Sequence, residues 1–391
     1  MQQVKKNTIQ LLISILVLFT LSACGDSGLN RISAQERLFL DLSLEYLGEY
    51  RLDDASYKDT PIGGLSAITY NRKNSRFYAL SDDRSFTAPA RFYTLEFSFA
   101  TDLTGAVNFD KVQVVDVTFL KDTQGENFAP GTIDPEGIAL SPQGTLFISS
   151  EGLASLGLDP MVGEFELATG KQINSLRLPD RYLPSANLGK EEPRGVQNNL
   201  AFESLTIKSS GLSTSDPFRL FTATESALLQ DTLPPETEEG ARVRLLHYLI
   251  QPIATPVLVA EHLYPLDFPP TGTLSNGLTE LLAIEPEGFF LSLERTYGTF
   301  GFGAKIFQIA TGNATDTSTS PTLKGNLTQV KPLRKQLVLD LGVLGIELDN
   351  LEGMTLGPRL PDGSQSLILV SDNNFKEKQV TQFLLFRLIS R

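Results

Sequence analysis

The chain has 391 residues, of which 41% are hydrophobic and 20% are charged, and its formal net charge at pH 7 is −13. These proportions are those of an ordinary globular protein, and the acidic balance disfavours binding to nucleic acid or to anionic membrane surfaces, both of which need a basic patch. The single cysteine, Cys24, excludes an intrachain disulfide, so stability must come from packing.

The N-terminus has the pattern of a bacterial lipoprotein signal peptide. A charged stretch with Lys5 and Lys6 precedes an apolar run at 9–21, which is too short to span a bilayer comfortably. Leu-Ser-Ala-Cys then ends at Cys24 and matches a lipobox, although a plain signal peptide or a buried cysteine is the alternative. Lipid on this cysteine would anchor the protein to a membrane without a spanning helix. The predicted segments are a signal peptide at 1–23, the lipidated Cys24 with a tether at 24–40, and one domain at 41–391.

After the tether, a paired motif occurs five times at intervals of about 70 residues. In each copy a short apolar segment is followed by a second one that ends in a carboxylate. The paired segments start at Gly63 and Phe77, at Asp134 and Leu146, at Phe202 and Leu220, at Gly277 and Phe289, and at Leu351 and Leu367. Apolar and polar residues alternate over short stretches bounded by Gly, Pro, Asn and Asp, which indicates strands rather than helices.

This pattern predicts an all-β fold, a β-propeller of five four-stranded blades. The fifth repeat lacks its outer strand, and the segment 42–50 before the first repeat can supply it and so close the ring. A sixth blade hidden in a long insertion is the alternative. The insertion at 311–326 is rich in Thr, Ser, Asn and Gly, and it is expected to be a mobile loop.

Acidic residues recur where the inner hairpin of each blade would face one mouth of the central channel. The start of the first strand and the end of the second lie at the same face of a propeller, so these carboxylates are expected to converge. The predicted metal ligands at this mouth are Asp82, Asp83, Glu136, Glu151, Glu203, Glu225, Glu294, Glu352 and Asp372, and Glu280 is paired with Glu294.

Like charges this close repel unless cations, arginines or protons neutralise them. Oxygen-rich sites without nearby His or Cys suit Ca²⁺ or Mg²⁺, and Ca²⁺ is the cofactor we predict. Arg84 and Arg295 follow two of the acidic positions, and they could balance charge or hold substrate oxygens. The alternative is that the acids only accept hydrogen bonds from backbone N–H groups of neighbouring blades. No nucleophile elbow, P-loop, dinucleotide fingerprint or zinc-protease motif is present.

The motifs resemble those of the phytase-like family, which is also described as having esterase-like activity of phytase. The resemblance rests on Gly-Gly-Leu-Ser-Ala-Ile-Thr-Tyr from Gly63, Asp-Pro-Glu-Gly-Ile-Ala from Asp134, Phe-Glu-Ser-Leu from Phe202, Leu-Glu-Arg-Thr-Tyr-Gly from Leu293, and Asn-Leu-Glu-Gly-Met-Thr-Leu-Gly-Pro-Arg from Asn350. It implies a secreted or lipid-anchored bacterial propeller and the hydrolysis of phosphate or carboxylic esters.

These observations lead us to expect a metal-assisted phosphoester hydrolase that acts at the acidic mouth, with Glu136, Glu352 and Arg295 as catalytic residues. A metal-independent carboxylesterase is a second hypothesis, although no catalytic triad is visible. The alternative from another class is a non-catalytic propeller that binds a ligand, glycan or protein. We expect a monomer in the cell envelope, on the periplasmic side or the cell surface, whose partners are the membrane and a small phosphorylated or ester substrate.

Overall fold

The computed structural model describes residues 38–53, 56–184, 193–209, 211, 213–234 and 236–390. The predicted signal peptide, Cys24 and most of the tether lie outside the described residues. Within the described ranges, no helix is both long and apolar enough to cross a membrane.

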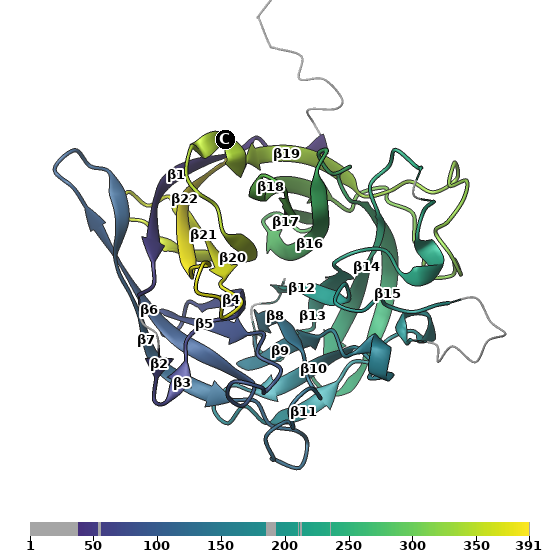
Figure 1. The fold of residues 1–391 in the computed structure, drawn as a ribbon, viewed down its shortest axis with the longest axis horizontal. Helices are drawn as coiled ribbons and strands as arrows, with labels where there is room; N and C mark the ends of the chain where they lie inside the picture. Colours follow the sequence, from purple (N-terminus) through teal and green to yellow (C-terminus); the bar gives the residue numbers. More distant parts are fainter. Residues whose placement is uncertain are drawn as a thin grey trace, which may run out of the picture. The chain divides into compact units, whose positions relative to one another are not determined.

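Five four-stranded antiparallel sheets form a ring around a central axis, which is a β-propeller (Figure 1). Blade 1 contains β4 (Leu65–Asn71), β5 (Arg76–Ser81), β6 (Arg91–Thr101) and β7 (Val107–Phe119). Blade 2 contains β8 (Pro135–Leu140), β9 (Thr145–Ser150), β10 (Met161–Glu166) and β11 (Gln172–Ser175). Blade 3 contains β12 (Phe202–Ser209), β13 (Phe218–Thr224), β14 (Arg242–Gln251) and β15 (Ala254–Pro265). Blade 4 contains β16 (Thr273–Ile284), β17 (Phe289–Gly298), β18 (Gly301–Ala310) and β19 (Arg334–Asp340).

Blade 5 joins the two ends of the domain. It contains β20 (Asn350–Arg359), β21 (Gln365–Asp372), β22 (Gln382–Ser390) and, as its outer strand, β1 (Leu42–Arg51). β1 pairs antiparallel with β22 from Leu42 opposite Ser390 to Arg51 opposite Gln382. The predicted closure by the N-terminal strand is thus confirmed. The alternative of a sixth blade is wrong, because the only other sheet in the described part of the chain is the small pair β2 (Ser56–Tyr57) and β3 (Thr60–Pro61).

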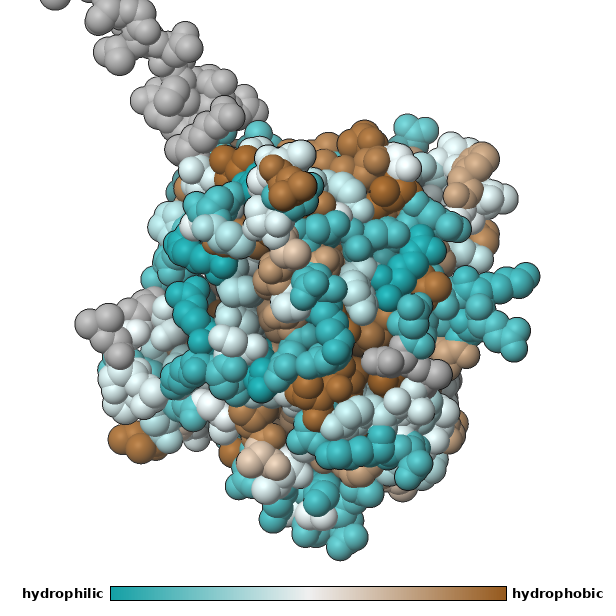
Figure 2. All heavy atoms as spheres, turned by 90° about the vertical axis from the view of Figure 1, so that its left-hand side faces the viewer, coloured by the Kyte–Doolittle hydropathy of each residue, from teal (hydrophilic) through white to brown (hydrophobic). Residues whose placement is uncertain are grey.

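The hydrophobic cores lie between adjacent blades. Between blades 5 and 1, for example, Phe77 and Tyr93 pack in one cluster with Ile368 and Phe383. Similar clusters join blade 1 to blade 2, blade 2 to blade 3, and blade 3 to blade 4. Each fully buried Phe, Leu or Ile contributes about 1.5–3 kcal/mol, so these cores hold the inner strands in place. On the outer wall near β1, β6 and β7, apolar side chains are exposed among polar ones (Figure 2), as is usual at protein surfaces.

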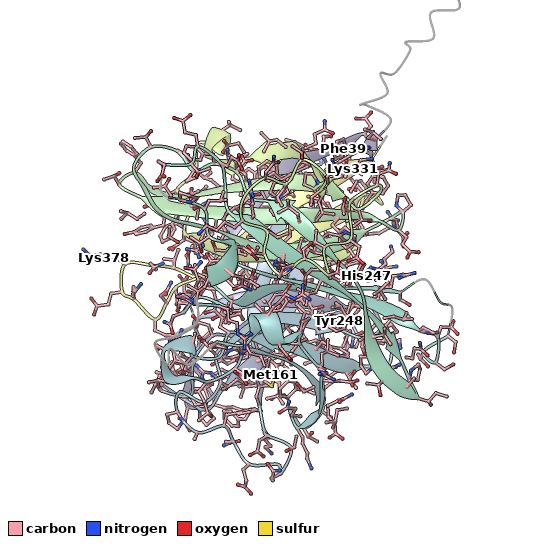
Figure 3. All side chains as sticks on the ribbon, turned by 90° about the vertical axis from the view of Figure 1, so that its right-hand side faces the viewer. Phe39, Met161, His247, Tyr248, Lys331 and Lys378 are labelled. Carbon is pink, nitrogen blue, oxygen red and sulfur yellow. The ribbon has the colours of Figure 1, made fainter. Side chains whose placement is uncertain are left out.

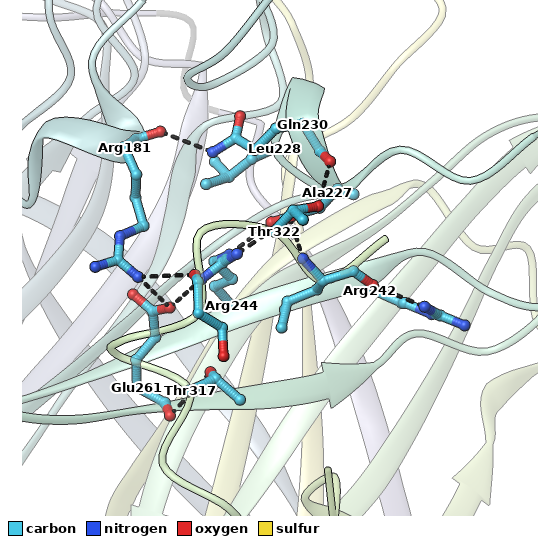
Figure 4. Close-up of polar contacts among 12 residues, drawn as sticks. Arg181, Ala227, Leu228, Gln230, Arg242, Arg244, Glu261, Thr317 and Thr322 are labelled. Carbon is cyan, nitrogen blue, oxygen red and sulfur yellow. Dashed lines mark hydrogen bonds and ion pairs between the residues drawn. The ribbon is translucent and has the colours of Figure 1, made fainter. Parts of the chain in front are cut away.

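The insertion at 311–326 is fastened to blade 3 rather than left as the free loop that its composition predicts. Arg244 and Arg181 both donate to the carbonyl of Ser320, at 3.2 Å in each case, and the N–H of Leu323 donates to Asp231. Figure 4 shows Arg181, Arg244 and Glu261 of this network close together. Arg244 is fully buried, and its guanidinium also contacts Asp231 at 2.5 Å and the carboxylate of Glu261. Composition could not reveal this anchoring, because the partners come from strands and short 3-10 turns that are distant in sequence.

Replacing the buried Arg244 with Ala should destabilise the protein by about 3–5 kcal/mol, because two buried carboxylates would lose their shared cation. Arg219→Ala is the matched control in the same blade, since Arg219 makes a partly exposed ion pair with Glu287, and such pairs contribute about 0–1 kcal/mol. Urea unfolding of the two variants measures the difference. Equal free energies of unfolding would contradict a structural role for the Arg244 network.

Candidate functional site

A cleft of about 980 Å³ opens at one mouth of the ring, and all five blades contribute to it. We call it the acidic cleft. It is lined by Asp82, Asp83, Arg84, Phe86, Thr87, Asp134, Glu136, Asn199, Glu203, Arg295, Tyr297, Phe302, Asn350, Glu352, Asp372 and residues 374–379. Figure 3 shows Lys378, one of these residues, on a loop that projects outward.

Every inner strand has a β-bulge, and at three of the bulged positions, Glu136, Glu203 and Glu352, the side chain lines the cleft. The register shifts just after Leu65, Pro135, Phe202, Leu278 and Leu351. A bulge re-aims the extra residue, and the bulged positions form one ring of equivalents. This first ring consists of Ser66, Glu136, Glu203, Thr279 and Glu352. On the second strand of each blade, the residue that follows the partner of the pre-bulge residue belongs to a second ring, which consists of Asp82, Glu151, Glu225, Arg295 and Asp372.

Blade 4 differs from the arrangement that its sequence predicts. Leu278 pairs with Glu294, so Arg295, and not Glu294, is the counterpart of the carboxylates in the second ring. The Glu294 side chain is held elsewhere, by the Tyr264 hydroxyl at 2.5 Å and by Lys335 Nζ at 2.6 Å. The prediction that Glu294 joins the metal ligands is therefore not supported by its position. A one-residue shift along a strand sends a side chain to the other face.

Glu280 is likewise one residue beyond the ring position, which Thr279 occupies. It is buried in the channel, where it accepts hydrogen bonds from the N–H groups of Leu205 and Leu281, at 3.2 Å and 2.9 Å. It lines a separate hollow of about 210 Å³ between the inner strands. Glu280 thus ties blade 3 to blade 4 and does not reach the acidic cleft.

Three carboxylates of blade 2 lie close enough together to hold one cation. Asp134, Glu136 and Glu151 each offer an oxygen, and these oxygens all lie within 4.8 Å of one another. Two of the three were predicted from the sequence, whereas Asp134 was missed because it stands before the strand. Arg84 borders the group, with Nη2 2.6 Å from Asp134 Oδ2 and 2.8 Å from Asn199 Oδ1.

Arg295 is the cationic member of the second ring. Its Nη2 lies 3.0 Å from Glu225 Oε1 and 3.6 Å from Glu352 Oε1. Glu225 fits here because the facing residue is Gly277, where a Cβ atom would lie only 2.1 Å from Glu225 Oε1. The cleft therefore has a carboxylate group on blade 2 and an arginine on blade 4.

Further polar lining of the cleft comes from blades 3 and 5. Asn350 Nδ2 donates to Glu352 Oε1 at 2.8 Å and to Asp372 Oδ2 at 3.3 Å. Asn350 Oδ1 and Glu203 Oε2 are buried and accept no hydrogen bond from the described residues. Oxygen atoms in this state are available to a ligand or a cation that enters the cleft.

Asp83 lines the cleft but is already satisfied. It contacts the buried Arg91 at 2.8 Å and accepts hydrogen bonds from the N–H groups of residues 86–88. Burial alone would raise its pKa, but Arg91 and these N–H groups hold the pKa of Asp83 below its ordinary value. Its role is therefore to shape the loop that carries Phe86, and it is not a good candidate for a metal ligand.

The other carboxylates have raised pKa values, and burial is the largest cause for each. Burial and the neighbouring Asp372 raise the pKa of Asp82 well above its usual range, and burial and Asp134 do the same for Glu136. The pKa of Glu151 rises to about 8, as does that of Glu352. Burial also raises the pKa of Asp372, to about 6. The cleft thus binds protons near neutrality where no other cation compensates its charge.

Comparisons with known proteins place the chain in a family. The family model "Phytase-like", described as "Esterase-like activity of phytase", matches residues 60–375. It is the family that the sequence motifs resemble, and the matched span includes the inner hairpins of all five blades. No curated protein sequence matches the chain.

Solved structures show only distant similarity. The endo-arabinase from Bacteroides thetaiotaomicron VPI-5482 has a TM-score of 0.43 at 10% identity, over 83% of this chain and 94% of that one. The tail fibre of Staphylococcus aureus phage P68 has a TM-score of 0.39 at 9% identity, over 88% and 53%. The α-L-arabinofuranosidase of Podospora anserina has a TM-score of 0.32 at 10% identity, over 89% and 97%. Similarities this weak carry no argument about activity.

Proposed function

The chain belongs to the phytase-like family, and from this premise we propose that it is a metal-assisted phosphoester hydrolase. The observation that carries the proposal is the group formed by Asp134, Glu136 and Glu151, whose oxygens lie within 4.8 Å of one another beside a large open cleft. Such a site offers an ion several charged oxygens at one wall and leaves space for a substrate on the other side.

Ca²⁺ fits this donor set best, with Mg²⁺ as the second choice. The donors that lie together are the carboxylate oxygens of Asp134, Glu136 and Glu151. Asn350 Oδ1 and Glu203 Oε2 line the same cleft from other blades, and these buried oxygens accept no hydrogen bond from the described residues. Hard cations take such oxygen ligands, and Ca²⁺ tolerates their irregular arrangement. When bound, the ion would supply Lewis acidity toward a phosphoryl oxygen.

The protein's own side chains would bind the phosphate and transfer protons. Arg84 and Arg295 border the cleft from blades 1 and 4, and their guanidinium groups suit the recognition of phosphate oxygens. Burial and Asp372 raise the pKa of Glu352 to about 8, so near neutral pH this carboxyl group can give or take a proton. We assign Glu352 as the general acid or base and Arg295 as the residue that orients the phosphate.

The second candidate function is a non-catalytic binding propeller. It is favoured by the ion pairs that already neutralise part of the site, Arg84 with Asp134 and Arg295 with Glu225. It is also favoured by Glu151, whose side chain accepts a hydrogen bond from the Ala201 N–H of the next blade. In this case the acids would join the blades together, and a bound Ca²⁺ would stiffen the mouth.

Calcium titration with a parallel activity assay separates the two functions. The full chain, freed of metal by a chelator, is titrated with Ca²⁺ in a calorimeter, and phosphate release from phytate and from an aryl phosphate is measured in the same samples. Calcium binding together with calcium-dependent release supports the hydrolase. Binding without release supports the binding propeller, and absence of binding eliminates the metal.

We also propose that lipid on Cys24 anchors the protein at the cell envelope, outside the cytoplasm. The lipobox after a short apolar run supports this, as does the absence of any other cysteine. Incorporation of a labelled fatty acid into the expressed chain should be lost in Cys24→Ser. Labelling that persists in this variant would refute the anchor.

A further inference from the structure

Exposed aromatic side chains gather at the acidic cleft. Among the described residues, five aromatic residues have more than a third of their surface exposed to solvent: Phe86, Phe268, Tyr297, Phe300 and Phe375. All except Phe268 line the cleft or the hollow next to it. The exposure reaches 72% for Phe86 and 93% for Phe300. Large aromatic groups are costly to leave in water, and their grouping around one opening indicates a binding surface.

The acidic cleft continues into a second hollow of about 440 Å³ between blades 4 and 5. The two share Phe302, Lys378 and Gln379 in their walls. The turn between β17 and β18 stands between them, with Tyr297 in the cleft and Phe300 in the second hollow. The rings of Tyr297 and Phe302 pack with centroids 4.7 Å apart. The cleft alone is at the upper end of the roughly 300–1,000 Å³ that small-molecule sites occupy, so the two hollows suit an elongated ligand.

The polar side chains that line the two hollows indicate which kind of ligand ring the aromatic side chains would contact. Amide side chains of Asn199, Asn350, Asn374 and Gln379 line the walls, and an amide both donates and accepts hydrogen bonds. The carboxyl groups between them accept hydrogen bonds from hydroxyl groups. A sugar ring has C–H bonds on its face, which pack on an aromatic ring, and hydroxyl groups at its edge, which need such polar partners. A purely aromatic ligand would instead need an apolar enclosure.

We infer that the cleft and the second hollow together bind an oligosaccharide, which lies across Tyr297, Phe302 and Phe300. The phosphate of the proposed reaction would then be esterified to a saccharide. That last step rests on the proposed function, whereas the binding of the saccharide rests on the aromatic and amide lining alone.

Saccharide binding is tested with an immobilised panel of defined oligosaccharides, both neutral and phosphorylated. The full chain is applied to the panel, and the oligosaccharide retained best is titrated in a calorimeter. Tyr297→Ala and Phe300→Ala should each weaken its affinity about tenfold. The matched control is Phe268→Ala, which removes the exposed aromatic group away from the hollows and should leave the affinity unchanged. Thermal midpoints equal to that of the parent protein show that the variants are folded.

Retention of no saccharide would overturn the inference, as would unchanged affinity in both rim variants. Phosphate release from an aryl phosphate and from the phosphorylated oligosaccharides of the panel, measured on the same preparations, keeps the two proposals apart. Release without saccharide binding overturns the saccharide inference and leaves the hydrolase standing. Saccharide binding without release supports the inference and overturns the hydrolase.

Discussion

Glu136→Gln should abolish calcium-dependent phosphate release and, at the same time, stabilise the metal-free protein. Glu136 is half-buried beside Asp134, and desolvation together with this neighbour raises its pKa well above the ordinary value. A glutamine has a similar shape without the charge, so it relieves repulsion in the metal-free cleft. The same change removes a ligand oxygen, and turnover should fall about 100-fold or more. Thermal midpoints with and without Ca²⁺, measured beside turnover, show both effects.

The control for this variant is Glu294→Gln, the same substitution at a carboxylate that the structure places away from the cleft. Glu294 holds Tyr264 and Lys335, so its loss should lower the thermal midpoint while calcium-dependent turnover persists. A parent-like calcium response in Glu136→Gln, or a lost response in Glu294→Gln, would contradict the assignment of the site to blade 2.

The ring itself could be predicted from the sequence because every blade repeats one inner hairpin. Short apolar runs, such as those in 77–81 and 146–150, mark the strands, and the same pair of segments recurs at nearly constant spacing. The closure of the ring by β1 could be predicted by counting strands, because the fifth repeat has three strands and lacks its outer one. These features are local or periodic, and a single sequence displays both.

The fourth blade shows where prediction of the site residues from the sequence fails. Thr279 and Glu280 lie side by side between Leu278 and Leu281, and Glu294 lies beside Arg295. Sequence alone shows an acid near each expected position, and only the bulge decides which residue of each pair takes the ring position. A bulge depends on pairing between strands, so an error of one residue was not detectable from composition or periodicity.

Two site residues that the sequence analysis missed have a recognisable position in the sequence. Asp134 and Asn350 each stand two residues before a ring glutamate, Glu136 and Glu352. That shared spacing, a side chain with oxygen followed two residues later by glutamate, would have added both to the candidate ligands. Asn199 left no such signal, because it lies outside the paired motifs and its link to the site is the hydrogen bond that it accepts from Arg84.

The metal-free protein should lose stability as the pH rises from about 5 to about 8.5, and saturating Ca²⁺ should restore it. Burial raises the pKa of Asp372 to about 6 and that of Glu151 and Glu352 to about 8. Between the ordinary pKa of a carboxyl group and these values, the native state holds more protons than the unfolded state. The free energy of unfolding therefore decreases with pH in this window and levels off above it. The loss is on the order of a few kcal/mol, since each unit of pKa corresponds to about 1.4 kcal/mol.

Calcium reverses this trend because it replaces the protons. Binding needs the ionised carboxylates, so calcium affinity increases with pH, and the stabilisation by Ca²⁺ should be small at pH 5 and large at pH 8.5. Thermal midpoints across this range, in chelator and in excess Ca²⁺, give two curves that diverge with pH. In Glu136→Gln, the curve in chelator should be flatter and the divergence smaller. Parallel curves in the parent protein would mean that arginines and hydrogen bonds alone satisfy the carboxylates, and the binding propeller without a metal would then be the better description.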